Sequence, residues 1–186
     1  MLAFGANISG AVGSPEQTLS WTIVQLSRAG MDVIDISEPV TTRAVGGKTR
    51  LPYLNAAVLV ACDRSPADLL RTLKRLERQA GRRTLARNAS RPLDLDILLW
   101  RGGRVGFSRH GRRFGSVQIP HPELYRRAFM MVPLTSLVPF WWHAGFREPG
   151  RRLVRRLVIR PGDIAPGGGR SRGEACVRPS SVAKGD

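Results

Sequence analysis

Two aspartates separated by a single residue are the side chains of this sequence best suited to chemistry. Asp94 and Asp96 lie in the run RPLDLDILLW, residues 91–100. If this run is a strand, the two carboxylates share one face while the apolar residues at 93, 95, 97 and 99 share the other. Two fixed carboxylates repel unless a cation intervenes, and such hard oxygen ligands suit Mg²⁺ bound to a substrate phosphate. A half-exposed strand with a polar face would have the same pattern, so both interpretations stay open on this motif alone.

Four arginines precede the aspartates, between a predicted helix and the predicted strand: Arg82, Arg83, Arg87 and Arg91. Guanidinium groups bind phosphate oxygens through paired hydrogen bonds, so arginines beside two carboxylates fit a site for a nucleotide with Mg²⁺. A solvated arginine-rich loop is the alternative. Glu77, three residues after Lys74 in the helix, is expected by default to form an ion pair at the surface.

A histidine between two prolines is a second candidate, in the run PHPELYRRAF of residues 120–129. The prolines restrict the backbone around His121, and Arg127 and Phe129 follow at the start of a predicted helix. Imidazole can donate a hydrogen bond to a phosphate oxygen, whether it is neutral or protonated. A lone histidine is also a common structural residue, and the spacing does not decide between the two.

Several other chemistries have no motif in this sequence. It contains neither G-x-x-x-x-G-K-[ST] nor a G-x-G-x-x-G between strand and helix, so a nucleotide must be held by side chains and Mg²⁺. Spacings typical of a zinc site or of a Ser-His-Asp triad are also absent. Cys62 and Cys176 lie in unlike contexts, which argues against a disulfide and favours a reducing cytoplasm. With no signal peptide and no apolar run of membrane-spanning length, no membrane contact is expected.

The charge is concentrated in three segments of the 186 residues. The chain has 30 Lys and Arg against 14 Asp and Glu, a net charge of +16. Residues 71–91 carry +7, residues 101–118 carry +5 and residues 147–186 carry +6, which leaves −2 for the rest. Such a balance indicates an anionic partner, a phosphate or a nucleic acid, and says nothing about the fold.

The elements that must position these residues follow a βαββαβ order. Ser-Pro pairs at 14–15 and 65–66, each followed by apolar residues at helical spacing, predict two helices that end at Gly30 and Gly81. Strands are predicted at 2–5, 31–42, 53–61 and 93–100, and further helices at 122–131 and 150–159. This order is typical of a ferredoxin-like α+β sandwich, with helices on one face of an antiparallel sheet and the other face free for chemistry.

Composition divides the chain at about residue 160. Residues 1–160 are predicted to form one domain. Residues 161–186 are rich in Gly and Arg and lack apolar periodicity, which predicts a disordered basic tail.

Four motifs together resemble one known family over about residues 1–146. They are Gly5-Ala6-Asn7, Tyr53-Leu54-Asn55-Ala56-Ala57-Val58, Arg91-Pro92-Leu93-Asp94-Leu95-Asp96-Ile97-Leu98, and Pro120-His121-Pro122 followed by Arg127-Ala128-Phe129 and Val132-Pro133-Leu134. Their order and spacing resemble those of the 6-hydroxymethyl-7,8-dihydropterin pyrophosphokinases of folate biosynthesis. The resemblance implies a ferredoxin-like fold and transfer of the β,γ-diphosphate of ATP to the pterin hydroxymethyl oxygen, with release of AMP.

The same resemblance implies a role for individual residues. Asp94 and Asp96 match the aspartates that bind two Mg²⁺ ions, and together with Arg82 and Arg83 of a mobile loop they match the catalytic residues. Matches to the pterin site are Thr42, Val45, Tyr53, Asn55 and Phe129, with the two aromatic rings on either side of the pterin. Matches to the ATP site are Glu77, Arg91, Ile97, His121 and Arg127, of which Arg91, His121 and Arg127 contact phosphates. A monomer in the cytoplasm is expected.

Two alternatives belong to other classes. A small RNA-binding module can share the sheet topology and the basic charge, although no strand has the aromatic pattern of such modules. A homologue that only binds the pterin is the other alternative. It is suggested by the loop at 82–91, which looks one residue shorter than usual and has Asn88-Ala89-Ser90 where the family often has Trp-Gly-Pro.

Overall fold

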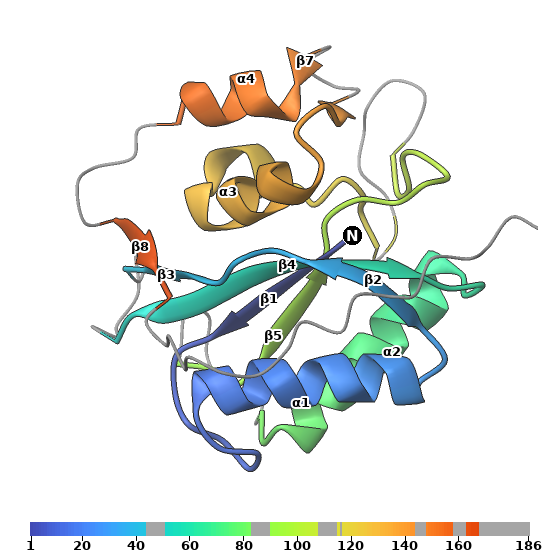
Figure 1. Cartoon of the computed structure of the whole chain (residues 1–186). Helices are drawn as coiled ribbons and strands as arrows, with labels where there is room; N and C mark the ends of the chain where they lie inside the picture. The colour runs from blue at the N-terminus through green and yellow to red at the C-terminus, as the bar shows by residue number, and fades with distance from the viewer. Residues whose placement is uncertain are drawn as a thin grey trace, which may run out of the picture.

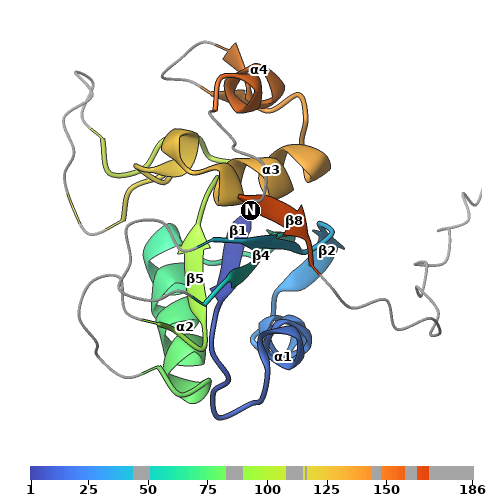
Figure 2. The ribbon, with the colours of Figure 1, turned by 90° about the vertical axis from the view of Figure 1, so that its left-hand side faces the viewer.

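The computed structural model describes residues 1–43, 51–82, 90–107, 115, 117–143, 148–157 and 163–167. A main sheet lies between two layers of helices, as both views of the ribbon show (Figures 1 and 2). The elements, in chain order, are β1 (Leu2–Ala6), α1 (Pro15–Arg28), β2 (Asp32–Ile36), β3 (Val40–Thr42), β4 (Tyr53–Ala61), α2 (Pro66–Gln79), β5 (Asp94–Ile97), a 3₁₀ turn (Leu124–Arg126), α3 (Ala128–Leu137), β6 (Trp142–His143), β7 (Glu148–Pro149), α4 (Gly150–Arg155) and β8 (Ile164–Pro166).

Serine caps begin both helices of the lower layer in Figure 1, as the sequence predicts. The Ser14 hydroxyl accepts a hydrogen bond from the Gln17 backbone, and the Gln17 side chain accepts one from the Ser14 backbone, which completes a capping box. Ser65 caps α2 through the Asp68 backbone N–H. Both helices are followed by a glycine with positive φ, at +76° for Gly30 and +94° for Gly81, a conformation that favours glycine.

The main sheet is antiparallel, with strand order β5-β1-β4-β3-β8 and with β2 also paired to β4. This order agrees with the predicted ferredoxin-like α+β class. The single strand predicted at 31–42 is two strands, β2 and β3, on the same partner. Between them the Ser37 hydroxyl accepts the Ala57 N–H, so a side chain replaces one backbone acceptor of the ladder.

The second face of the sheet is not free, contrary to the sequence-based expectation. Helix α3 packs against β4, and α4 packs on α3 (Figure 1). The α3 sequence AFMMVPLTSL has too few polar residues for a solvated face, so it requires burial on several sides. The second apolar cluster that results is formed by Leu98, Leu124, Met130, Met131, Leu134 and Leu153.

Several predicted boundaries are wrong by a few residues. The helix predicted at 122–131 is a 3₁₀ turn followed by α3, which continues past Pro133 because Met131 and Leu134 on either side are fully buried. The strand predicted at 93–100 is confined to Asp94–Ile97. The last predicted helix, at 150–159, is α4 at Gly150–Arg155, and residues 158–160 lie outside the described ranges.

The predicted disordered tail is contradicted at residues 164–166. These residues form β8, which pairs with β3 over three residues. Strand β3 would otherwise leave unpaired backbone groups on that side, and β8 provides partners for them. Residues 168–186 lie outside the described part of the chain.

The main apolar core lies between the sheet and the layer of α1 and α2. Leu73 of α2 is fully buried there, with Phe4 of β1 and Leu95 of β5 in the same cluster. None of the described helices is long and apolar enough to span a membrane.

We expect Leu73→Ala to lower the free energy of unfolding by about 2–5 kcal/mol, because it removes buried methyl groups and leaves a cavity. Val24→Ala is the matched control, since the Val24 side chain is 47% exposed on α1 and should change stability by about 0.5 kcal/mol or less. Urea denaturation followed by circular dichroism measures both. Equal effects of the two substitutions would contradict this placement of the core.

Candidate active site

Strand β5 places the two aspartates on one face. The Leu95 and Ile97 side chains are buried in the main core, whereas the Asp94 and Asp96 side chains are each 26% exposed on the opposite face. The predicted alternation is therefore confirmed within β5. It fails for Leu99, because the strand ends at Ile97 and Leu98 and Leu99 both contact the second cluster.

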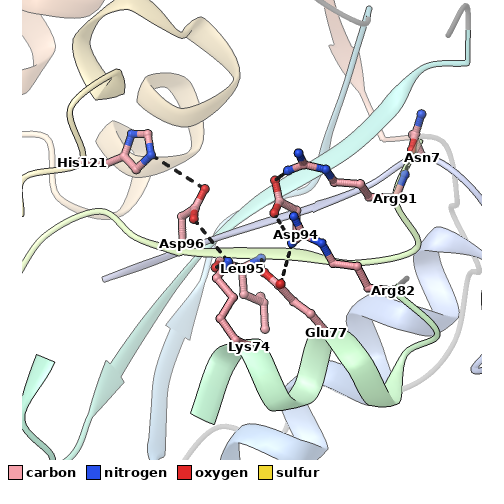
Figure 3. Close-up of polar contacts among 9 residues, drawn as sticks. All are labelled: Asn7, Lys74, Glu77, Arg82, Arg91, Asp94, Leu95, Asp96 and His121. Carbon is pink, nitrogen blue, oxygen red and sulfur yellow. Dashed lines mark hydrogen bonds and ion pairs between the residues drawn. The ribbon is translucent and has the colours of Figure 1, made fainter. Parts of the chain in front are cut away.

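Two arginines neutralise Asp94 (Figure 3). Arg82 Nη1 donates to Asp94 Oδ1 at 2.6 Å, and Arg91 Nη1 donates to Asp94 Oδ2 at 2.7 Å. Burial alone would raise the pKa of Asp94, but the positive charges of Arg91 and Arg82 outweigh it and hold that pKa below its ordinary value. Asp94 is thus a carboxylate with a guanidinium on each oxygen.

Glu77 lies beneath this pair and is buried, at 2% exposure, contrary to the surface ion pair expected by default. Its Oε2 lies 2.5 Å from Arg82 Nη1, and its Oε1 accepts hydrogen bonds from the Leu95 backbone at 2.8 Å and from Lys74 Nζ at 2.7 Å. Burial raises the pKa of Glu77, against the opposing effect of Lys74 and Arg82. These contacts favour a positioning role for Glu77, which joins α2 to β5 and orients Arg82, over the nucleotide contact implied by resemblance.

Asp96 has looser partners than Asp94. Lys74 Nζ lies 3.8 Å from Asp96 Oδ1, and His121 Nε2 lies 3.9 Å from Asp96 Oδ2, both beyond hydrogen-bonding distance (Figure 3). His121 Nδ1 accepts a hydrogen bond from the Glu123 backbone at 3.2 Å, which directs Nε2 toward Asp96. The backbone N–H of His121 donates to the backbone carbonyl of Leu98, which attaches this loop to the end of β5. His121, to which the family resemblance assigns a phosphate contact, therefore lies beside Asp96 of the aspartate pair.

Two residues of this cluster were not assigned a role by sequence reasoning. Lys74 Nζ donates to the Leu95 carbonyl at 3.1 Å as well as to Glu77. Asn7 Oδ1 accepts the Arg91 N–H at 2.7 Å, and the Asn7 N–H donates to the Arg91 carbonyl at 3.1 Å. The contact between Lys74 and Glu77 could have been predicted, because the two residues are three positions apart in a predicted helix. The Asn7 contact spans 84 positions, and no local pattern indicates it.

Three of the predicted pterin residues, Thr42, Tyr53 and Asn55, lie on the paired strands β3 and β4. Asn55 is buried, and its Nδ2 donates to Thr42 Oγ1 at 2.8 Å and to the Tyr53 carbonyl at 3.2 Å, which fixes the amide orientation. Burial raises the pKa of Tyr53. Phe129 is the second residue of α3, the helix packed on β4, and the Arg127 guanidinium lies 5.7 Å from the Phe129 ring centroid.

Gly5 connects the two groups of residues. In the sheet register Gly5 of β1 is the partner of Asn55 on one side and of Asp94 on the other. A Cβ at Gly5 would lie 3.4 Å from Asn55 Oδ1 and 4.0 Å from Asp94 Cβ, which is ordinary van der Waals contact, so both side chains flank the same face and glycine leaves the space between them open. Neighbouring strands are about 4.8 Å apart, which puts the backbones of Asn55 and Asp94 about 10 Å apart across β1.

Among the described residues, Ile97 is a predicted site residue whose side chain does not join this cluster. The Ile97 side chain is 5% exposed and faces the main core, so only its backbone is available to a nucleotide. Val45 and Arg83 lie outside the described residues.

The aspartates fit Mg²⁺ better than a metal held by protein ligands alone. Within the described ranges, no three His, Cys, Asp or Glu side chains converge as a metal site would require. A cation between Asp94 and Asp96 would therefore take its other ligands from water or from phosphate oxygens, as Mg²⁺ commonly does. The open position of Asp96 is compatible with this donor set.

Comparison with known proteins decides the family. A family model described as 7,8-dihydro-6-hydroxymethylpterin-pyrophosphokinase (HPPK) matches residues 1–139. The chain belongs to the HPPK family. This confirms the resemblance, and with it the predicted class of activity, an ATP-dependent pyrophosphokinase of folate biosynthesis. Members of the HPPK family use ATP with Mg²⁺.

Curated relatives and a solved structure agree with membership of the HPPK family. The 2-amino-4-hydroxy-6-hydroxymethyldihydropteridine pyrophosphokinase of Synechocystis sp. is 29% identical over 95% of this chain and 89% of its own length. The enzyme of the same name from Haemophilus influenzae is 32% identical over 84% of this chain and 89% of its own length. An HPPK-DHPS crystal structure in complex with substrates has a similar fold, with a TM-score of 0.58 at 14% identity over 83% of this chain. The chain spans 42% of that longer protein.

We expect the pKa of His121 to lie below the ordinary value of about 6.5, because burial disfavours the imidazolium, so His121 is neutral at pH 7. The Asp96 charge opposes this shift, so Asp96→Asn should lower the pKa of His121 further. An NMR pH titration of the histidine ring protons measures both, with His121→Gln to assign the signal. A titration midpoint at or above about 6.5 would show that burial does not control the pKa of His121. A midpoint that Asp96→Asn leaves unchanged would show that Asp96 does not.

Proposed function

We propose that this HPPK family member uses the β5 aspartates, the flanking arginines and the Asn55 pocket to transfer the diphosphate of ATP to 6-hydroxymethyl-7,8-dihydropterin. The observation that supports this most is the row of Asn55, Gly5 and Asp94 across three neighbouring strands. In the proposal, a flat heterocycle would bind at Asn55 beside metal-bound phosphates at Asp94, on one face of the sheet.

The proposed reaction is a single displacement at the β-phosphorus of ATP. The pterin hydroxymethyl oxygen forms a bond to the β-phosphorus, the bond from that phosphorus to the oxygen bridging to the α-phosphate breaks, and AMP leaves with that oxygen. The hydroxyl proton is released. Such a transfer depends mainly on positioning and charge neutralisation, so no covalent enzyme intermediate is needed.

The residues divide these tasks. Tyr53 and Phe129 would stack on the pterin ring, and Asn55 with Thr42 would bind its polar edge. Arg82, Arg91, His121 and Arg127 would bind phosphate oxygens, for which a guanidinium is well suited. Asp94 and Asp96 would hold two Mg²⁺ ions, which when bound supply charge neutralisation for the migrating phosphates. The two-ion count, the contributions of Val45 and Arg83, the monomeric state and the cytoplasmic location stay predictions.

The alternatives named from sequence are not favoured. An RNA-binding module of this topology uses the sheet face opposite its two helices, and here α3 packs on that face. A homologue that only binds the pterin has no need of the ordered cluster of Asp94, Arg82, Arg91 and His121.

The proposal is tested by AMP formation from ATP, Mg²⁺ and the reduced hydroxymethylpterin, measured by chromatography, with Asp96→Asn as the variant. We expect a loss of about 100-fold or more, because the substitution removes one of the carboxylates that hold Mg²⁺. Asp96→Asn is cleaner than Asp94→Asn, which would also leave two arginines without their partner. Asp32→Asn, on an exposed position of β2, is the matched control. Near-normal turnover in Asp94→Asn and Asp96→Asn alike would refute the metal role.

For Arg82→Ala we expect the chemical step to slow by about 100-fold while the affinity for the pterin stays nearly unchanged, because Arg82 faces the metal and phosphate side of the site. Rapid-quench measurement of AMP gives the first quantity, and pterin fluorescence titration gives the second. Arg78→Ala, at an exposed position in the last turn of α2, controls for the lost charge. Loss of pterin binding in Arg82→Ala with an unchanged chemical step would show that the assignment is wrong.

A further inference from the structure

The two metal-ligand candidates differ in how their oxygens are occupied. Both oxygens of Asp94 accept hydrogen bonds from guanidinium groups, at 2.6 and 2.7 Å. Asp96 has its cationic neighbours only at 3.8 and 3.9 Å. The positions that a divalent cation would take on Asp94 are thus shared with Arg82 and Arg91 (Figure 3).

A divalent cation would compete with these guanidinium groups for the oxygens of Asp94. A cation bound to either oxygen would lie within a few ångströms of a guanidinium nitrogen, where two positive charges repel strongly in a partly buried site. The Asp94 carboxylate can therefore bind either the arginines or a metal ion, and each disfavours the other. The structure shows the arginine-bound state.

Arg91 is the better placed of the two to leave. Arg82 has a second carboxylate, Glu77, which holds it at 2.5 Å whether or not Asp94 is available. For the Arg91 guanidinium, Asp94 is the one hydrogen-bonding partner among the described side chains. Asn7 fixes the Arg91 backbone on both its N–H and its carbonyl, so the side chain can move from an anchored base.

We propose that Arg91 occupies the metal position of Asp94 until nucleotide arrives, so that metal loading and delivery of Arg91 to the phosphates are coupled. This inference rests on the proposed function for the identity of the nucleotide, but the competition on Asp94 does not. When phosphates offer Arg91 a new partner, Asp94 is released for the cation. Without nucleotide, the protein therefore binds divalent metal weakly. When ATP binds, the affinity of the protein for the metal rises. By linkage, metal raises the affinity for ATP by the same factor.

The experiment measures binding of Mn²⁺ alone to the full, nucleotide-free chain by electron paramagnetic resonance, with Mg²⁺ as competitor. Arg91→Gln should bind Mn²⁺ about 5-fold or more tightly than the wild type, within the usual range of coupling between sites. Arg91→Lys keeps the positive charge and should stay near the wild type. Arg71→Gln is the matched control, because it removes one charge from an exposed position of α2, and it should leave Mn²⁺ affinity unchanged. Asp94→Asn in the Arg91→Gln background should abolish the gain.

Coupling is the second readout. A non-hydrolysable ATP analogue should increase Mn²⁺ affinity more in the wild type than in Arg91→Gln, whose metal position is already open. Unchanged or weaker Mn²⁺ binding in Arg91→Gln, relative to Arg71→Gln, would overturn the proposal. If Arg91→Gln does not fold, Arg91→Met makes the same test, because it also removes the guanidinium from Asp94 Oδ2. A wild type that forms no AMP would refute the proposed function alone, since the Mn²⁺ comparison needs no turnover.

Discussion

The site depends on one constraint: the carboxylates gathered at the start of β5 repel one another, and neighbouring positive charges must compensate them. Three carboxylates, Glu77, Asp94 and Asp96, meet within one network, and Lys74, Arg82 and Arg91 balance them. An uncompensated buried carboxylate would be costly, and the most buried of the three, Glu77, makes the most contacts. Because its oxygens also accept the Leu95 N–H, charge balance and strand position are fixed by the same side chain.

The central strand β1 joins this local arrangement to the pterin candidates of the proposed function. Its partners are β4, which carries the pterin candidates, and β5, which carries the aspartates. Since β1 has a glycine at the shared register position, no side chain separates Asn55 from Asp94. In the proposed function, the sheet would therefore set the spacing between the heterocycle and the polyphosphate through its backbone hydrogen bonds, which form a rigid support.

Features that depend on residues close in sequence could be predicted. The capped starts of α1 and α2 follow from Ser-Pro pairs, and the shared face of Asp94 and Asp96 follows from strand alternation. Features set by distant partners could not. The burial of Glu77 depends on Leu95, 18 positions away, and β8 exists only because β3 offers it backbone partners. The extent of α3 past residue 131 depends on burial of its apolar side chains against distant parts of the chain, and the helix continues through Pro133.

The net positive charge of the chain does not come from the residues of the candidate site. The six ionic side chains around Asp94 balance, so the net charge of +16 comes from residues elsewhere in the chain. Exposed arginines such as Arg71 and Arg75 on the outer side of α2 contribute to it. At 0.1 M salt, charges more than about 10 Å apart are largely screened, whereas contacts near 2.7 Å between partly buried groups are screened much less. In the proposed function, the outer arginines would therefore affect how fast an anionic nucleotide arrives, while the balanced cluster would hold its phosphates and metal.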